Sequence, residues 1–218
     1  MIVLTSNLFI ERNVESLNWV IGVLVFVLLL SVISRVLFTS NYFALKNVEI
    51  FTEVNDNQLL FSITNQIMFA LLIGTLAAPY LTQDFDFVFL HPISKAIMVG
   101  VLMILFFWVK YFFTVLGNFA FKSNQDLTTL IRVSSFYRSY SVVVMWIAVV
   151  LFYFTSIPKI PILVLCLLSL ILLRAFQLRY RFKLQPDQNS RDWYYNILYL
   201  CALEILPLLV LGKFLTIW

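Results

Sequence analysis

The sequence predicts an all-α protein, a polytopic transmembrane helical bundle with six spans and both termini outside, on the periplasmic face. Three observations lead to this prediction. Of the 218 residues, 62% are hydrophobic and only 12% are charged. The apolar residues occur in long continuous runs, whereas a transmembrane barrel needs alternating strands of about ten residues. The basic residues are concentrated in alternate connecting segments, as the positive-inside rule requires.

The composition excludes several classes of protein. Soluble domains are about half apolar and about one quarter charged. The 22 Phe residues carry more apolar surface than one small soluble core can bury. A disordered chain, a secreted disulfide scaffold and a water-soluble enzyme are therefore excluded.

Six apolar segments are long enough to cross a hydrocarbon core of about 30 Å, which takes about 20 helical residues. They lie at about 18–38, 59–81, 96–117, 140–156, 160–178 and 192–214. The gaps between them are too short for a separate folded domain. Residues 1–218 are therefore predicted to form a single transmembrane domain.

The first two spans differ in their polar content. The first has no charge from Trp19 to Leu30, and we expect it to be retained because no basic signal-peptide region precedes it. The second carries Asn65 and Gln66, which we expect to bond across helices rather than to bind substrate. Its Gly74 and Ala78 are a small-residue pair four apart, which favours close approach of another helix.

Two connecting segments have distinct character. Residues 39–58 are mixed in charge and either dock a partner or are simply solvated. In the segment 118–139, Ser123 and Asp126 resemble a capping box, and Leu127 and Ile131 share a helical face. We therefore predict a short interfacial helix over about 123–138.

Prolines define the connection between the fourth and fifth spans. Pro158 and Pro161 stop helices on both sides, because proline lacks an N–H and disfavours helix in the residue before it. The pattern predicts a tight hairpin at the membrane surface.

The Lys and Arg residues divide four to eleven between the two sides of the predicted topology. The eleven lie at the ends joined by loops 39–58, 118–139 and 179–191, which we predict to be cytoplasmic. This asymmetry either serves orientation alone or includes a patch for anionic lipid or a partner. The candidate patch follows the fifth span and comprises Arg174, Arg179, Arg181 and Lys183.

The sixth span contains Glu204 near its middle, where an acid costs about 2.5–3.5 kcal/mol to insert. Pro207 frees the carbonyl of Leu203, and Cys201 lies one turn before the acid on nearly the same face. Glu204 is therefore either a proton or cation site or an interhelical bond that fixes packing or assembly.

Residues with catalytic or ligand-binding chemistry are sparse. His91 is the only histidine, and zinc sites need three or four ligands. Cys166 and Cys201 lie within apolar spans and are expected to pack as small apolar residues. No phosphate-binding glycine loop or nucleophile motif is present. We predict no enzymatic activity, no cofactor, no metal and no nucleic-acid binding.

The stretch 195–209 resembles the end of a family of inner-membrane proteins from Bacteroidota, catalogued as domain of unknown function 4271. The chain length, its richness in Phe and Leu, and the segment 41–43 are also similar to that family. The resemblance draws attention to Tyr199, Cys201, Glu204 and Pro207. It implies a multi-pass protein of the bacterial inner membrane and no assigned activity.

Two functions remain open from the sequence. The first is a non-enzymatic membrane subunit that assembles with other inner-membrane proteins in envelope biogenesis, protein export or secretion. The second is a small proton-coupled transporter or channel that uses Glu204. Only the sixth span has a proline away from its ends, so the halves lack the matched broken helices common in transporters.

Overall fold

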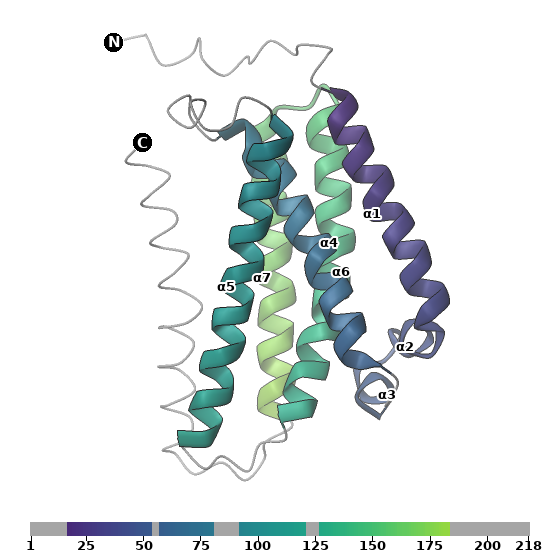
Figure 1. Ribbon diagram of the computed structural model, residues 1–218, viewed down its shortest axis with the longest axis vertical. Coiled ribbons are helices and arrows are strands. Elements are labelled where there is room, and N and C mark those ends of the chain that lie inside the picture. The colour runs from purple at the N-terminus through teal and green to yellow at the C-terminus, as the bar shows by residue number, and fades with distance from the viewer. Residues whose placement is uncertain (1–16, 54–56, 81–91, 121–126, 184–218) are drawn as a thin grey trace.

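The computed structural model describes residues 17–53, 57–80, 92–120 and 127–183, and these residues are almost entirely helical (Figure 1). The elements in chain order are α1 (Leu17–Leu37), α2 (Thr39–Ala44), α3 (Val48–Glu53), α4 (Gln58–Ala77), the 3-10 turn η2 (Ala78–Tyr80), α5 (Pro92–Ala120), α6 (Leu127–Phe154) and α7 (Lys159–Lys183). The described part of the chain contains no strand. The prediction of an all-α protein is confirmed for these residues.

Five of the helical segments are long and apolar enough to cross a membrane. They are Leu17–Leu37, Gln58–Tyr80, Pro92–Phe112, Ile131–Phe154 and Lys159–Tyr180. The first, second and fifth agree with the predicted spans to within about two residues, as is usual for helix boundaries. The third begins earlier than predicted because Pro92 occupies the first helical position, which proline tolerates well. The predicted sixth span, 192–214, lies outside the described residues.

Helix α6 differs from the prediction. We predicted an interfacial helix over about 123–138 and a separate span over about 140–156. The structure instead has one continuous helix of 28 residues. Residues 127–154 contain neither glycine nor proline to interrupt it. Val133 and Phe136, in its first turns, are also buried. The first turns of α6 are therefore part of the packed bundle.

Pro158 lies in the connection between α6 and α7, and Pro161 lies in the first turn of α7, where proline is tolerated. Helix α6 ends at Phe154 and α7 begins at Lys159, so a turn of four residues joins two antiparallel helices that pack together (Figure 1). The prediction of a hairpin at this position is confirmed.

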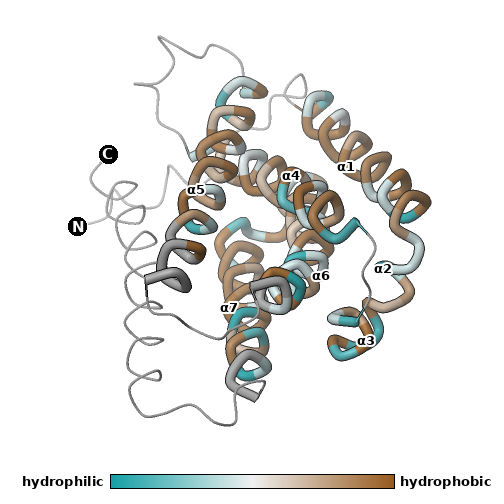
Figure 2. The backbone as a smooth tube through the Cα atoms, turned by 60° about the horizontal axis from the view of Figure 1, so that its bottom comes forward, coloured by the Kyte–Doolittle hydropathy of each residue, from teal (hydrophilic) through white to brown (hydrophobic). Residues whose placement is uncertain are grey.

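Helices α4 and α6 form the centre of the bundle. About half of the apolar window of each is buried, 50% in α4 and 44% in α6, against 22% in α1 and 17% in α5 and α7. Figure 2 shows that α1 and α5 are hydrophobic along most of their described length, and many of their large apolar side chains are exposed. Such large apolar surfaces are unfavourable in water, and they are suited to contact with the hydrocarbon core of a bilayer.

The close contact between α4 and α5 depends on Gly74. A Cβ atom at this position would lie 2.1 Å from the carbonyl oxygen of Ala96 in α5. Ala78 is also buried, at 5% exposure, and its 3-10 turn contacts α5. The predicted close approach of another helix to this small-residue pair is confirmed.

Candidate functional site

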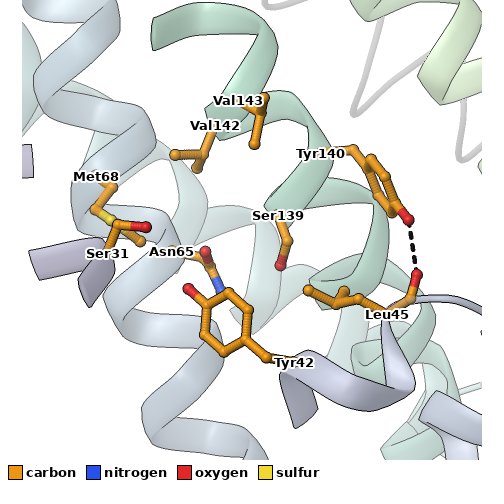
Figure 3. A pocket seen from close by; sticks show the side chains of 9 residues that line it. All are labelled: Ser31, Tyr42, Leu45, Asn65, Met68, Ser139, Tyr140, Val142 and Val143. Carbon is orange, nitrogen blue, oxygen red and sulfur yellow. Dashed lines mark hydrogen bonds between the residues drawn. The ribbon is translucent and has the colours of Figure 1, made fainter. Parts of the chain in front are cut away.

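A cavity of about 150 Å³ lies where α1, α2, α4 and α6 meet (Figure 3). Its polar lining consists of Ser31, Tyr42, Asn65, Ser139 and Tyr140. Its apolar lining consists of Leu45, Met68, Val142 and Val143. The described residues that line this cavity carry no charge, and their polar groups are neutral hydroxyl, amide and thioether groups.

Three of the polar groups are held by backbone carbonyls. The Asn65 Nδ2 atom donates to the Phe61 carbonyl at 3.0 Å, and the Ser139 hydroxyl donates to Ser135 at 3.1 Å. The Tyr140 hydroxyl donates to the Leu45 carbonyl at 2.7 Å and so links α6 to the end of α2. These bonds fix the orientation of the lining because each donor has a defined acceptor.

Tyr42 completes the polar side of the cavity. Its ring packs edge-on against Phe61, with ring centroids 5.5 Å apart and an interplanar angle of 90°. Figure 3 shows the Tyr42 hydroxyl and the Ser139 hydroxyl on the same side of the cavity as the Asn65 amide. Hydroxyls and an amide converge here from three helices.

A cavity of this polarity and size suits water or a small neutral guest. Apolar cavities stay dry, whereas polar ones hold water when two to four hydrogen-bonding groups are available. Among the residues that the structure describes, those lining the cavity include neither a carboxylate nor an imidazole.

The two predicted polar residues of the second span have different environments. Asn65 is buried, at 2% exposure, and lines the cavity, whereas Gln66 is partly exposed and does not. We expected Asn65 to bond across helices, but its Nδ2 atom instead bonds within α4. A short amide side chain reaches the carbonyl four residues earlier in its own helix, which satisfies the donor locally.

The predicted basic patch is divided in the structure. The Arg174 Nη1 atom donates to Gln177 Oε1 at 2.8 Å, and Gln177 is buried, at 2% exposure. Arg179 is exposed. Arg181 and Lys183 lie in the last turn of α7, where the structure describes the backbone alone. Arg174 is therefore associated with the bundle, and Arg179 is directed away from it.

The candidates in the predicted sixth span lie outside the described residues. These are Tyr199, Cys201, Glu204 and Pro207. Their predicted roles stay predictions.

Sequence reasoning missed the residues that α6 contributes to the cavity. Ser139 and Tyr140 were assigned to the boundary between a loop and a span, because the preceding segment was interpreted as interfacial. The spacing held a usable signal: Ser135, Ser139, Val142 and Val149 follow the three- and four-residue steps of one helical face. That face is buried in the structure.

Comparison with known families identifies the chain more closely. The sequence model of the domain of unknown function DUF4271 matches residues 3–215. The chain belongs to this family. The match includes all five candidate spans of the DUF4271 chain, its cavity and the stretch 195–209 that carried the resemblance. No curated protein and no solved structure matches the chain.

Proposed function

We propose that this DUF4271 protein is a non-enzymatic, multi-pass subunit of the bacterial inner membrane. It assembles with other membrane proteins in a complex of envelope biogenesis, protein export or secretion. The observation that carries the proposal is the connection between α1 and α4. It contains two short helices, α2 and α3, which we call the platform (residues 39–53).

An aromatic cluster anchors the platform. Phe51 of α3 and Phe61 of α4 are fully buried, with ring centroids 5.9 Å apart. Phe136 of α6 also packs against Phe51, with ring centroids 5.5 Å apart. Aromatic pairs of this kind contribute about 0.5–1.5 kcal/mol beyond their burial, so the platform is tied to both central helices.

Hydrogen bonds hold the backbone of the platform as well. The Arg132 Nη1 atom donates to the Thr52 carbonyl, and the Gln58 Nε2 atom donates to the Phe51 carbonyl at 3.2 Å. The Tyr140 hydroxyl holds the Leu45 carbonyl. A segment that served only as a tether would need none of these bonds, so the platform is built to present a defined surface.

The outer surface of the platform combines apolar and charged groups. Phe43 is 69% exposed and Ile50 is 53% exposed. Lys46, Glu49 and Glu53 are also exposed beside them. Exposed aromatic and aliphatic side chains ringed by charges are typical of protein interfaces, which supports docking of a partner here.

Site-specific photo-crosslinking tests this function. We expect a benzophenone amino acid at position 43 or 50 to capture one membrane protein at endogenous expression, and the same partner to copurify with wild type. The matched control is position 167, which is 61% exposed on α7 far along the chain from the platform. Phe43→Ser with Ile50→Ser should abolish copurification without loss of folding. A monodisperse protein that retains no partner after gentle solubilisation would refute the proposal.

The second candidate function is a proton-coupled transporter or channel that uses Glu204. The hydroxyl and amide groups between α2, α4 and α6 support it, because polar groups inside a membrane bundle often mark ion and proton pathways. In liposomes, wild type should conduct protons and Glu204→Gln should not. Flux equal to that of empty vesicles across pH values would eliminate this candidate and leave the first.

A further inference from the structure

The cavity between α1, α2, α4 and α6 has hydrogen-bonding groups to spare. Within the part of the chain that the structure describes, the Ser31 hydroxyl, the Tyr42 hydroxyl and the Asn65 Oδ1 atom have no hydrogen-bond partner. Figure 3 shows both hydroxyls on the side of the cavity where the Asn65 amide lies. Asn65 is 2% exposed, and a buried acceptor without a donor is uncommon in native proteins. These three groups are therefore available to a ligand.

The three groups together define the chemistry of that ligand. The Asn65 Oδ1 atom only accepts hydrogen bonds, whereas the Ser31 and Tyr42 hydroxyls can both donate. An alcohol group donates one hydrogen bond and accepts two, so it complements one acceptor and two donors. An ether or a ketone of the same shape would leave the Asn65 oxygen without a donor, which is costly for a buried amide.

The cavity lies well inside the candidate spans. Asn65 is seven residues after the start of the span Gln58–Tyr80, which is about 10 Å at 1.5 Å per residue. Ser31 is six residues before the end of the span Leu17–Leu37, about 9 Å. At this depth a charged headgroup is expensive, whereas a neutral hydroxyl with hydrogen-bond partners is tolerated. This depth therefore favours a neutral molecule dissolved in the bilayer.

The cavity reaches the outer face of α6. Val143 lines it and is also 57% exposed, and Tyr140 lines it and is 41% exposed. Ile147 lies one turn after Val143 and is 48% exposed, so the apolar surface continues along the helix. On the inner side, Met68 and Val142 add apolar lining. An alkyl chain can therefore extend from the cavity onto the lipid-facing surface of α6.

We propose that the cavity binds the free hydroxyl group of a neutral lipid of the diacylglycerol type. The hydroxyl donates to the Asn65 Oδ1 atom and accepts from Ser31 and Tyr42. The adjoining carbons contact the apolar lining, and one acyl chain passes Val143 to the surface of α6. A diacylglycerol has the required single alcohol, and it lacks the charged headgroup that would hold a phospholipid at the interface. The site does not depend on which partner docks on the outer surface of the platform.

Native mass spectrometry of the full chain tests the site. Purified protein is titrated with 1,2-dioleoylglycerol or with its methyl ether, which has the same acyl chains and no hydroxyl. We expect wild type to retain the alcohol about threefold to tenfold better, because the ether cannot donate to Asn65. Ser31→Ala and Tyr42→Phe should each weaken retention of the alcohol by about threefold to tenfold, and Asn65→Leu should abolish the preference.

Gln66→Leu is the matched control. It replaces the amide of the next residue, which is partly exposed and does not line the cavity, so the preference should be unchanged. Thermal unfolding followed by circular dichroism ensures that each variant compared is folded. Tyr42→Phe keeps the ring that packs edge-on against Phe61, so it tests the site even where Asn65→Leu is not folded.

Photo-crosslinking locates the bound lipid. A benzophenone amino acid at position 143 should crosslink to added dioleoylglycerol, and one at position 167, which is 61% exposed on α7, should do so far less. Three results would overturn the proposal. Equal retention of the alcohol and the ether by wild type assigns the cavity to water. A preference kept by both Asn65→Leu and Tyr42→Phe places the lipid elsewhere. Capture of a protein in place of the lipid at position 143 in native membranes assigns the opening to a partner helix.

Discussion

The Tyr153 hydroxyl of α6 donates a hydrogen bond of 2.8 Å to the carbonyl oxygen of Thr75 in α4. In an uninterrupted helix this carbonyl would accept from the N–H of residue 79, but Pro79 has none. Tyr153 therefore supplies the donor that proline removes. The bond joins the two central helices at the end of α4.

Tyr153→Phe should lower the free energy of unfolding by about 0.5–1.5 kcal/mol, because it leaves the Thr75 carbonyl without this donor. The effect should shrink in a Pro79→Ala background, where the backbone N–H of residue 79 becomes available. Equilibrium unfolding in mixed micelles measures the free energy of unfolding in the wild-type and the Pro79→Ala backgrounds. Tyr111→Phe is the control, since Tyr111 is 51% exposed on α5. Equal losses for Tyr153→Phe in both backgrounds would contradict the role assigned to Pro79.

This bond illustrates what sequence can and cannot predict here. A proline identifies which carbonyl loses its helical donor, but the replacement donor is 78 residues away and depends on helix packing. Length and hydropathy likewise predict the spans, because each is a property of about 20 neighbouring residues. The cavity required Ser31, Asn65 and Ser139 to converge from three helices, and no local pattern encodes that convergence.

Gly74→Ala should strongly destabilise the protein. The new Cβ would lie 2.1 Å from the Ala96 carbonyl oxygen, and both are parts of packed helices, so α4 and α5 must separate. Overpacking of this kind costs about 1–3 kcal/mol and occasionally more. The melting temperature in detergent measures the effect.

Gly22→Ala is the matched control for this substitution. A Cβ at Gly22 meets nothing within 4 Å, and Ala is the better helix former, so stability should be unchanged or slightly higher. The stability of Gly100→Ala should lie between those of Gly74→Ala and Gly22→Ala, because its Cβ would make an ordinary contact of 3.4 Å with the Ala70 carbonyl oxygen. A Gly74→Ala protein as stable as Gly22→Ala would show that α4 and α5 do not approach this closely.

Phe61→Ala should release the platform. Phe61 is fully buried and contacts the rings of Phe38, Tyr42 and Phe51. Removal of a buried Phe side chain costs about 3–5 kcal/mol. Hydrogen exchange should accelerate in residues 39–53, and trypsin should cleave faster after the exposed Lys46.

If the platform is a separate layer on the bundle, Phe61→Ala should lower protection from hydrogen exchange only in and around the platform. Phe61, Phe51 and Phe136 belong to a cluster distinct from the main core around Met145 and Val149. Exchange in residues 142–152 should therefore change little. Phe176→Ala, at a side chain 55% exposed on α7, should leave both regions unchanged. Uniform acceleration along the chain would instead mean that the two clusters unfold as one unit.

Cysteine labelling should determine the orientation of the bundle. The charge asymmetry predicts that the turn between α6 and α7 is periplasmic and that the platform is cytoplasmic. Ser156→Cys and Lys46→Cys report on these two places, and both side chains are exposed. The background should lack Cys166 and Cys201, so that a single thiol is labelled. In intact spheroplasts a membrane-impermeant maleimide should modify position 156, and position 46 only after lysis. Labelling of position 46 before lysis would reverse the predicted orientation, and labelling of both positions would contradict the assignment of three spans, α4, α5 and α6, between them.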